Sequence, residues 1–269
     1  MIAGEFFMSV TPKTLDEHLD YLFSIVRLKL WFLARWQKEH PEEEFSSILR
    51  NRVDIFRKTD INPEAITPRG SYYHLPAWLD LENRLKDIYS MVRGDEKLFE
   101  DCCFDLLRPT LEKRCERDFY DQSAAAAYQC GFLRHNLNLN IDGETLGFHI
   151  RNDRRPNSFF DDIPHIKECF LQLLDVAENK FSARCISTNT WLNSVEKWLD
   201  LFPQEWRDNL GEIDTDVRWH YGFWGQFINA RGAFNAKAGE KLRSTGKMPF
   251  YPRHSICTIA AMRKHIEQL

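Results

Sequence analysis

The chain has 269 residues, of which 43% are hydrophobic, and its formal net charge is −4. This length and apolar content suit one large domain or two moderate ones, and the acidic balance argues against a general nucleic-acid-binding protein. The longest apolar stretch is interrupted by Arg27, Lys29 and Arg35, so no membrane span is expected. Seven cysteines at unpatterned spacings, together with an N-terminus unlike a signal peptide, predict a cytoplasmic protein with free thiols.

The first half of the chain is predicted to be helical. Apolar residues recur at helical spacing from Thr14 to His40, with Thr14 as the N-cap and Glu17 completing a capping box. Pro109 is expected to break the helical pattern. Further helices are predicted over residues 45–56, 75–92, 97–107 and 111–133. We therefore expect a flexible N-terminus over residues 1–13 and an all-helical domain over residues 14–132.

Residues 137–150 predict a β-hairpin. Alternating apolar and polar residues flank Asp142-Gly143, a dipeptide typical of two-residue turns, and this register places Asn136 opposite His149. The apolar face then collects Leu137, Leu139, Ile141, Leu146, Phe148 and Ile150. The other face carries Asn136, Asn138, Asn140, Thr145, His149 and Arg151. This polar face is either a solvated edge or the floor of a functional site.

Helices and strands alternate in the remaining chain. Helices are predicted over residues 163–181, 195–199, 233–244 and 255–266, and strands over residues 183–190 and 217–228. Asn193 and Ser255 are expected to cap helices, and Gly246 is expected to end one. This order predicts the α+β class, with a mixed sheet backed by helices in a domain spanning residues 133–269.

His149 is the strongest candidate for a general base, because an imidazole can take a proton near neutral pH. The alternative is a structural histidine bonded to Asn136. His220 is a second candidate, although a core histidine would fit the aromatic segment around it equally well. A metal site of His135, His149 and His220 is disfavoured, because the hairpin register puts His135 and His149 on opposite faces. No metal is therefore expected. The chain also lacks the sequence motifs of the readily recognised enzyme classes.

Positive charge is concentrated near the C-terminus. Residues 230–269 contain eight Lys and Arg against two acidic residues. The segment from Asn229 to Gly239 combines the end of a predicted strand, a turn with Arg231 and Gly232, and the start of a helix, which together can receive a phosphate. Arg243 lies nearby in sequence. We expect a small anionic ligand here rather than nucleic acid, and an ordinary tight turn is the alternative.

Five short motifs in the second half carry a family resemblance: Phe132–Leu137, Leu146–Ile150, Thr190–Asn193, Trp224–Phe227 and Ser255–Ile266. Together they resemble an uncharacterised bacterial family of acyltransferase-like proteins. In that family a helical N-terminal domain precedes a GNAT-like domain, the fold of acetyl-coenzyme A-dependent N-acetyltransferases. Two features depart from the pattern. Asn193 replaces the second leucine of a Trp-Leu-Leu unit, and the coenzyme A loop is matched only by Arg231-Gly232-Ala233.

The resemblance implies a GNAT-like mixed sheet splayed around an acyl donor, and an acyltransferase that uses acyl-coenzyme A to modify an amine or hydroxyl. His149 is then the general base, with Asn136 orienting it and His220 as a further catalytic candidate. The implied coenzyme A contacts are Arg231, Gly232 and Arg243. The implied substrate contacts are Asn138, Asn140, Trp191 and Trp224. The alternative is a non-catalytic protein that offers an aromatic pocket of Trp191, Trp219 and Trp224 to a small molecule or partner.

Overall fold

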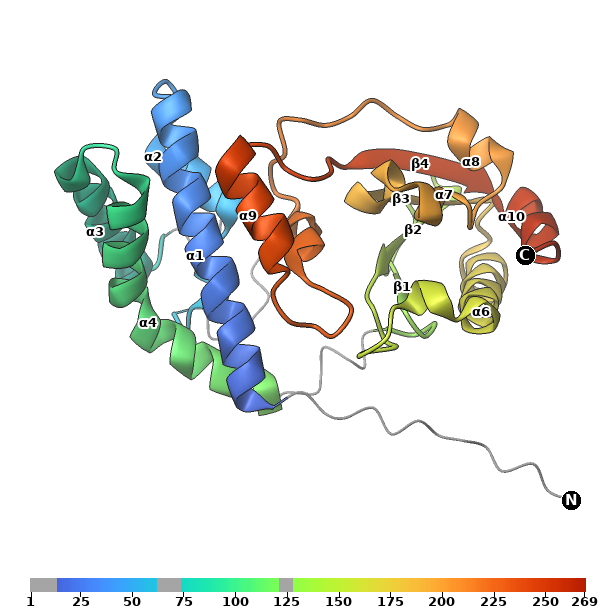
Figure 1. Cartoon of the computed structure of the whole chain (residues 1–269). Helices are drawn as coiled ribbons and strands as arrows, with labels where there is room; N and C mark the ends of the chain where they lie inside the picture. Colours follow the sequence, from blue (N-terminus) through green and yellow to red (C-terminus); the bar gives the residue numbers. More distant parts are fainter. Residues whose placement is uncertain (1–13, 62–73, 121–127) are drawn as a thin grey trace, which may run out of the picture.

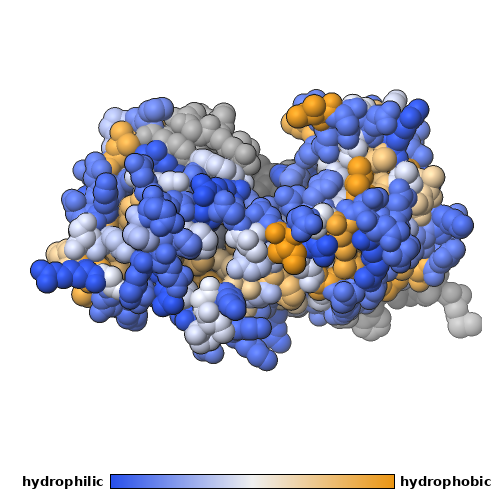
Figure 2. All heavy atoms as spheres, turned by 90° about the horizontal axis from the view of Figure 1, so that it is seen from above, coloured by the Kyte–Doolittle hydropathy of each residue, from blue (hydrophilic) through white to orange (hydrophobic). Residues whose placement is uncertain are grey.

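A computed structural model describes residues 14–61, 74–120 and 128–269. The predicted N-terminal tail over residues 1–13, and the part of the predicted helix over residues 121–127, lie outside the described residues. The structure is α+β, with a group of helices beside a four-stranded sheet (Figure 1). Hydrophilic residues cover most of the face seen in Figure 2, and hydrophobic ones are scattered over it in small groups. No helix within the described ranges is long and apolar enough to cross a membrane.

Helix α1 (Leu15–Glu39) is the central helix of the first half. Thr14 accepts a hydrogen bond from the backbone of Glu17, and the Glu17 carboxylate accepts one from the backbone of Thr14, so the predicted capping box is confirmed. Helix α4 (Glu96–Tyr120) packs along α1 (Figure 1). The other elements of this layer are α2 (Phe45–Ile48), a π-helical turn η1 (Leu49–Val53), a 3-10 turn η2 (Phe56–Lys58) and α3 (Pro76–Val92).

The predicted break at Pro109 is wrong, because α4 continues through it. A proline inside a helix removes one backbone hydrogen bond. The carbonyl that loses this bond belongs to Asp105, which is exposed to solvent. Leu107 and Leu111, on either side of the proline, are fully buried in the core. Burial of both leucines holds the helix together across a residue that would break it in isolation.

The predicted mixed sheet is confirmed. Its strands are β1 (Leu133–His135), β2 (Thr145–Ile150), β3 (Cys185–Thr190) and β4 (Arg253–Thr258), in that spatial order. β1 is antiparallel to β2, β2 is parallel to β3, and β3 is antiparallel to β4. Helices α6 (Ile163–Phe181) and α10 (Ile259–Ile266) pack on the sheet away from the helical layer (Figure 1). The short helices α7 (Glu196–Leu199) and α8 (Gln204–Asp208) connect β3 to the later segments.

An antiparallel hairpin exists, but its first strand is β1 instead of the predicted residues 137–141, and the predicted register is wrong. Arg134, rather than Asn136, lies opposite His149, and the connection between the strands is longer than two residues. The Asp142 carboxylate accepts hydrogen bonds from the backbone of Glu144 and Thr145, so it shapes the loop. Its side-chain bonding competes with the simple two-residue turn that the sequence predicts.

The predicted apolar face of the hairpin is only partly formed. Leu146 and Phe148 are buried, but Leu137 and Ile141 are exposed. Both exposed residues lie in the loop, where strand alternation no longer decides which side chains face the core.

The strand predicted over residues 217–228 is wrong. Residues Tyr221–Phe227 form a 3-10 helix, η6, and Trp219 has a φ of 57°, which a strand does not allow. Phe223, Trp224 and Phe227 are buried in the core of the helical layer. This segment does not join the sheet, because its aromatic side chains pack against the helical layer instead of a neighbouring strand.

Helix α9 (Ala236–Thr245) follows η6 and also packs against the helical layer, near α1 (Figure 1). Gly246 ends it in the left-handed conformation, as predicted. The core of the helical layer therefore draws on residues 217–248, which sequence reasoning had assigned to the second domain. The predicted helix start at Ser255 is wrong, because Ser255 lies in β4 and Thr258 caps α10.

Asn193 is a buried anchor rather than the predicted helix cap. Its Oδ1 accepts hydrogen bonds from the indoles of Trp198 and Trp206, at 2.9 and 3.2 Å. Its Nδ2 donates to the carbonyls of Thr188 and Arg253, at 3.0 and 2.8 Å. All four bonds lie in or at the edge of the core, so this amide ties the β3–β4 pair to the helices that follow it.

We expect Asn193→Ala to lower the free energy of unfolding by about 3 kcal/mol, because it leaves two buried indole N–H groups and two carbonyls without their partner. Chemical denaturation measures this loss. The matched control is Asn138→Ala at an exposed position, for which the expected change is within about 0.5 kcal/mol. Equal effects of the two substitutions would contradict the anchoring role of Asn193.

Candidate functional site

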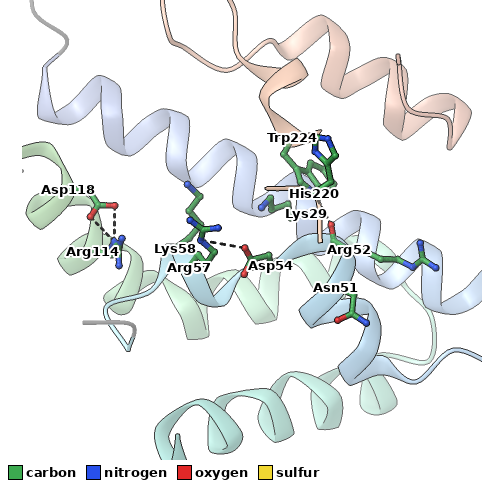
Figure 3. Close-up of a pocket in the computed structure, with 10 residues that line it drawn as sticks. All are labelled: Lys29, Asn51, Arg52, Asp54, Arg57, Lys58, Arg114, Asp118, His220 and Trp224. Carbon is green, nitrogen blue, oxygen red and sulfur yellow. Dashed lines mark hydrogen bonds and ion pairs between the residues drawn. The ribbon is translucent and has the colours of Figure 1, made fainter. Parts of the chain in front are cut away.

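A cavity of about 220 Å³ lies among α1, the η1 and η2 turns, α4 and the segment leading into η6 (Figure 3). Its basic lining residues are Lys29, Arg52, Arg57, Lys58 and Arg114, and its acidic ones are Asp54 and Asp118. Figure 3 shows Arg52 turned away from the others. Its guanidinium pairs with Glu43 and Asp216, which do not line the cavity. The lining therefore carries excess positive charge and can attract an anion.

Asp54 ends the π-helical turn η1 in the left-handed conformation, with a φ of 46°. Few residues other than glycine adopt this conformation, although aspartate is among those that tolerate it. Oδ2 lies 3.8 Å from the guanidinium of Arg57, while Oδ1 is buried without a hydrogen-bond partner in the described parts of the chain. Burial raises the pKa of this carboxyl, and Lys29 opposes the rise. Backbone strain and an unsatisfied buried oxygen together are typical of a functional site.

Lys29 is buried in the middle of α1, and its Nζ donates a hydrogen bond of 2.6 Å to the carbonyl of Val53. Burial lowers its pKa to about 7, and the charge of Asp54 limits the drop. Burial also lowers the pKa of Lys58, which forms no salt bridge with a carboxylate of the described chain. Both ammonium groups are poorly hydrated, so an anion that entered the cavity would stabilise their charged forms.

His220 connects the cavity to the sheet. Its ring lines the cavity, and its Nε2 lies 3.0 Å from the backbone carbonyl of Asn189 in β3. A carbonyl only accepts hydrogen bonds, so Nε2 carries a proton and, in the neutral ring, Nδ1 is the basic nitrogen. This Nδ1 is buried and has no partner among the residues that the structure covers. His220 therefore holds an unused hydrogen-bond acceptor beside the cavity.

The parallel strands β2 and β3 stop pairing partway along their length. Their register covers only Thr145–Gly147 and Cys185–Ser187, yet β2 continues to Ile150 and β3 to Thr190. Asn189, whose carbonyl accepts from His220, lies on the part of β3 beyond this pairing. His149 lies on the corresponding part of β2. The two histidines that sequence reasoning singled out are thus both at the point where the strands separate.

The side chain of His149 is held by Asn136. His149 Nε2 lies 2.9 Å from Asn136 Oδ1, so this contact forms despite the shifted register. The side chain of His149 is partly exposed to solvent, yet partial loss of hydration still lowers its pKa, and the neighbouring Arg134 and His220 lower it further. Gly147 leaves room for the arrangement, because a Cβ there would lie only 2.4 Å from Nδ2 of Asn136. His149 is therefore oriented and biased toward its neutral, basic form.

Three arginines gather near the end of β2. The guanidiniums of Arg134 and Arg151 lie 5.6 and 4.4 Å from the ring centre of Tyr128. Arg155 packs on Gly232, and a Cβ at that position would lie 3.1 Å from its Nη1. None of the three forms a salt bridge with a carboxylate of the described chain, and Nε of Arg151 is buried without a partner there. We call these three residues the arginine cluster.

The loop that carries Arg151 and Arg155 is bonded to the turn predicted to bind phosphate. Asn152 Nδ2 donates to the carbonyl of Ala230, at 3.1 Å. Gly232 has a φ of 82° in this turn, and the neighbouring Arg231 is exposed. The arginine cluster and Arg231 therefore border the same region, which makes it the better supported anion site near the sheet.

Other predicted site residues lie elsewhere. Arg243 forms a 2.6 Å salt bridge with the buried Glu100, which ties α9 to α4. Asn138 is exposed, while Asn140 donates to the hydroxyl of Ser187. Among the tryptophans, Trp224 lines the cavity, Trp191 stacks on Phe250, and Trp219 packs against the helical core. The three indoles therefore do not line a common cavity.

Cys169, His165 and Asp153 also lie together. His165 Nε2 is 2.8 Å from the Asp153 carboxylate and 3.4 Å from the Cys169 sulfur. The sulfur also lies 3.7 Å from Nδ1, so it faces the side of the ring instead of being aligned with one nitrogen as in a catalytic triad. Burial also raises the pKa of the Cys169 thiol to about 11. This cluster therefore lacks an activated nucleophile.

Sequence reasoning missed Lys29, Asp54, Lys58 and Arg114 of the cavity, and Arg155 of the arginine cluster. One signal was present in the sequence. Lys29 lies between Leu28 and Leu30 in an apolar stretch, and a lysine in a buried helix face is rare unless it has a partner or a function. Comparisons with protein-family models, curated proteins and solved structures found no match. The function is therefore inferred from the chemistry of these residues alone.

We expect the imidazole of His149 to titrate below the ordinary histidine value of about 6.5, because its surroundings disfavour the charged form. NMR of the histidine ring protons measures this midpoint. Since the folded pKa is depressed, the ring adds stability above pH 6.5 that is lost as the pH falls through the folded value. Removing a positive neighbour with Arg134→Gln should raise the midpoint. A wild-type midpoint at or above 6.5 would contradict the assignment.

Proposed function

We propose that the protein is an acyltransferase that moves an acyl group from a coenzyme A thioester to an amine or hydroxyl. The separation of β2 and β3 beyond Gly147 and Ser187 is the observation that carries this proposal. It leaves the backbone of β2 beyond Gly147 without pairing to β3, with an oriented histidine beside it. Ligands of sheets with parallel strands generally bind beyond the carboxyl ends of those strands, which is where His149 and the arginine cluster lie.

The edge of β2 that no longer pairs with β3 can form backbone hydrogen bonds with the extended arm of coenzyme A. His149 lies opposite Arg134 in the antiparallel pair with β1, and backbone groups alternate between the two edges of a strand. The backbone groups of Phe148 and Ile150 therefore point toward the edge that β3 has left. The arm of coenzyme A contains amide groups, which can pair with such an edge as an added strand does.

The reaction requires a base and a place for negative charge. The acceptor nitrogen or oxygen attacks the thioester carbon while its proton passes to Nδ1 of His149, which is the unprotonated nitrogen when Nε2 donates to Asn136. The carbon–sulfur bond then breaks, and the leaving thiolate takes up that proton. Backbone N–H groups on the open edge can stabilise the oxygen of the tetrahedral intermediate.

The arginine cluster replaces Arg243 as the proposed contact for the coenzyme A phosphates. Arg151 and Arg155 form no salt bridge with a carboxylate of the described chain, and Nε of Arg151 is buried without a partner there, so a phosphate would supply the missing negative charge. Arg243, in contrast, already pairs with Glu100. Arg231, at the turn bonded to the same loop, remains part of the proposed phosphate site.

We expect acetyl-coenzyme A to raise the melting temperature, and Arg155→Ala to weaken this binding at least tenfold, which corresponds to about 1.4 kcal/mol. Differential scanning fluorimetry with acetyl-coenzyme A, longer acyl thioesters and free coenzyme A measures both effects. Arg184→Ala is the matched control, because Arg184 is an exposed arginine just before β3, at the opposite end of the strands. The proposal fails if no thioester shifts the melting temperature, or if both substitutions act alike.

We expect His149→Ala to lower turnover about 10²-fold or more, because it removes the general base, while thioester binding changes little. Release of the coenzyme A thiol from acetyl-coenzyme A, in the presence of a panel of small amines, measures turnover. Asn136→Ala should cause a smaller loss, because it removes only the group that orients the ring. Unchanged turnover in His149→Ala would exclude this histidine as the base.

A further inference from the structure

The cavity of the helical layer offers two kinds of binding group at once (Figure 3). Lys58, Arg57 and Arg114 provide positive charge from η2 and α4. Asp54 Oδ1 and His220 Nδ1 are buried atoms without partners in the described chain. Asp54 Oδ1 accepts hydrogen bonds when the carboxyl is ionised, and His220 Nδ1 accepts them in the neutral ring. A ligand that satisfied both kinds of group would carry an anionic group and, close to it, an N–H or O–H donor.

His220 places the cavity next to the sheet. Its ring lines the cavity, while its Nε2 holds the Asn189 carbonyl on the part of β3 beyond its pairing with β2. The donor group of a molecule in the cavity would face Asp54 and His220, and its anionic group would contact the basic residues.

We propose that this cavity binds a small molecule that bears an amine or hydroxyl next to a phosphate or carboxylate. This binding does not rest on the proposed acyltransferase function. The N–H or O–H group of such a molecule is the kind of donor that Asp54 and His220 lack. The volume of about 220 Å³ limits the bound part to a compact molecule.

The first test is calorimetric titration of the full chain, without coenzyme A, with O-phosphoethanolamine, β-alanine, inorganic phosphate and ethanolamine. We expect saturable binding of at least one of the first two probes, which combine an anion with an amine, and their relative affinities identify the preferred anion. Inorganic phosphate should bind more weakly and ethanolamine not measurably. Absence of binding by both combined probes in the millimolar range would overturn the proposal, as would equal binding of inorganic phosphate.

The second test locates the binding. Lys58→Gln should weaken the combined probe about tenfold, the loss expected for a charge-assisted hydrogen bond. Lys113→Gln is the matched control, because Lys113 is an exposed lysine of α4 outside the cavity. Lys58 forms no salt bridge with a described carboxylate, so its replacement should leave the melting temperature nearly unchanged. Equal weakening by both substitutions would place the binding outside the cavity and overturn the proposal.

The third test separates the two kinds of group. Asp54→Asn keeps the shape of the side chain, and asparagine tolerates the left-handed backbone at this position. It should weaken the combined probe but leave inorganic phosphate unchanged or bound more tightly. Weakening of both probes to the same degree would contradict a donor-specific role of Asp54. Because these titrations omit the thioester, failure of thioester binding would remove the proposed function while leaving the cavity result intact, and the reverse also holds.

Discussion

The hydrogen bond between His220 and the Asn189 carbonyl is the contact on which the candidate site depends. It joins the part of β3 that no longer pairs with β2 to the segment that crosses to the helical layer. Two further bonds fix that segment at η1: the backbone of Trp219 donates to Asn51, and the indole of Trp224 donates to the carbonyl of Arg52. The unpaired part of β3 and the basic cavity are therefore connected through a single short segment.

A partly buried group of ion pairs holds the same crossing segment, with the Asp216 side chain exposed. Arg52 stacks on Trp36 and pairs with Glu43 and Asp216, and Asp216 lies just before the segment that carries His220. Desolvation makes such pairs expensive, and their net stabilisation is small, but removing one partner leaves an uncompensated charge. The arrangement thus favours one position of the crossing segment over others. Arg52 therefore contributes more to fixing the position of the crossing segment, and with it the cavity lining, than to overall stability.

Local signals explain which elements were predictable. The capping box at Thr14, the helix over Ile163–Phe181 and the Gly246 terminus each depend on residues within a few positions of one another, and all three are confirmed. The Asn136–His149 contact also forms, although the register from which it was predicted is wrong, because both residues belong to one short stretch of chain. The resemblance to GNAT-like proteins stays a prediction.

The errors share a different cause. Pro109 lies in a helix that packing on α1 maintains, and residues 217–228 alternate like a strand but bury their aromatic side chains against a distant layer. The cavity was missed for the same reason, because its lining comes from residues as far apart in sequence as Lys29, Arg114 and His220. Neither periodicity nor motif spacing contains this long-range information.

The most direct measurement of the central claim is a crystal structure of the protein with coenzyme A. The proposed acyltransferase predicts that the extended arm lies along Phe148–Ile150 of β2, between the separated strands, with the phosphates at Arg151 and Arg155. Binding of coenzyme A at another surface, or closure of the gap by renewed pairing of β2 with β3, would contradict it.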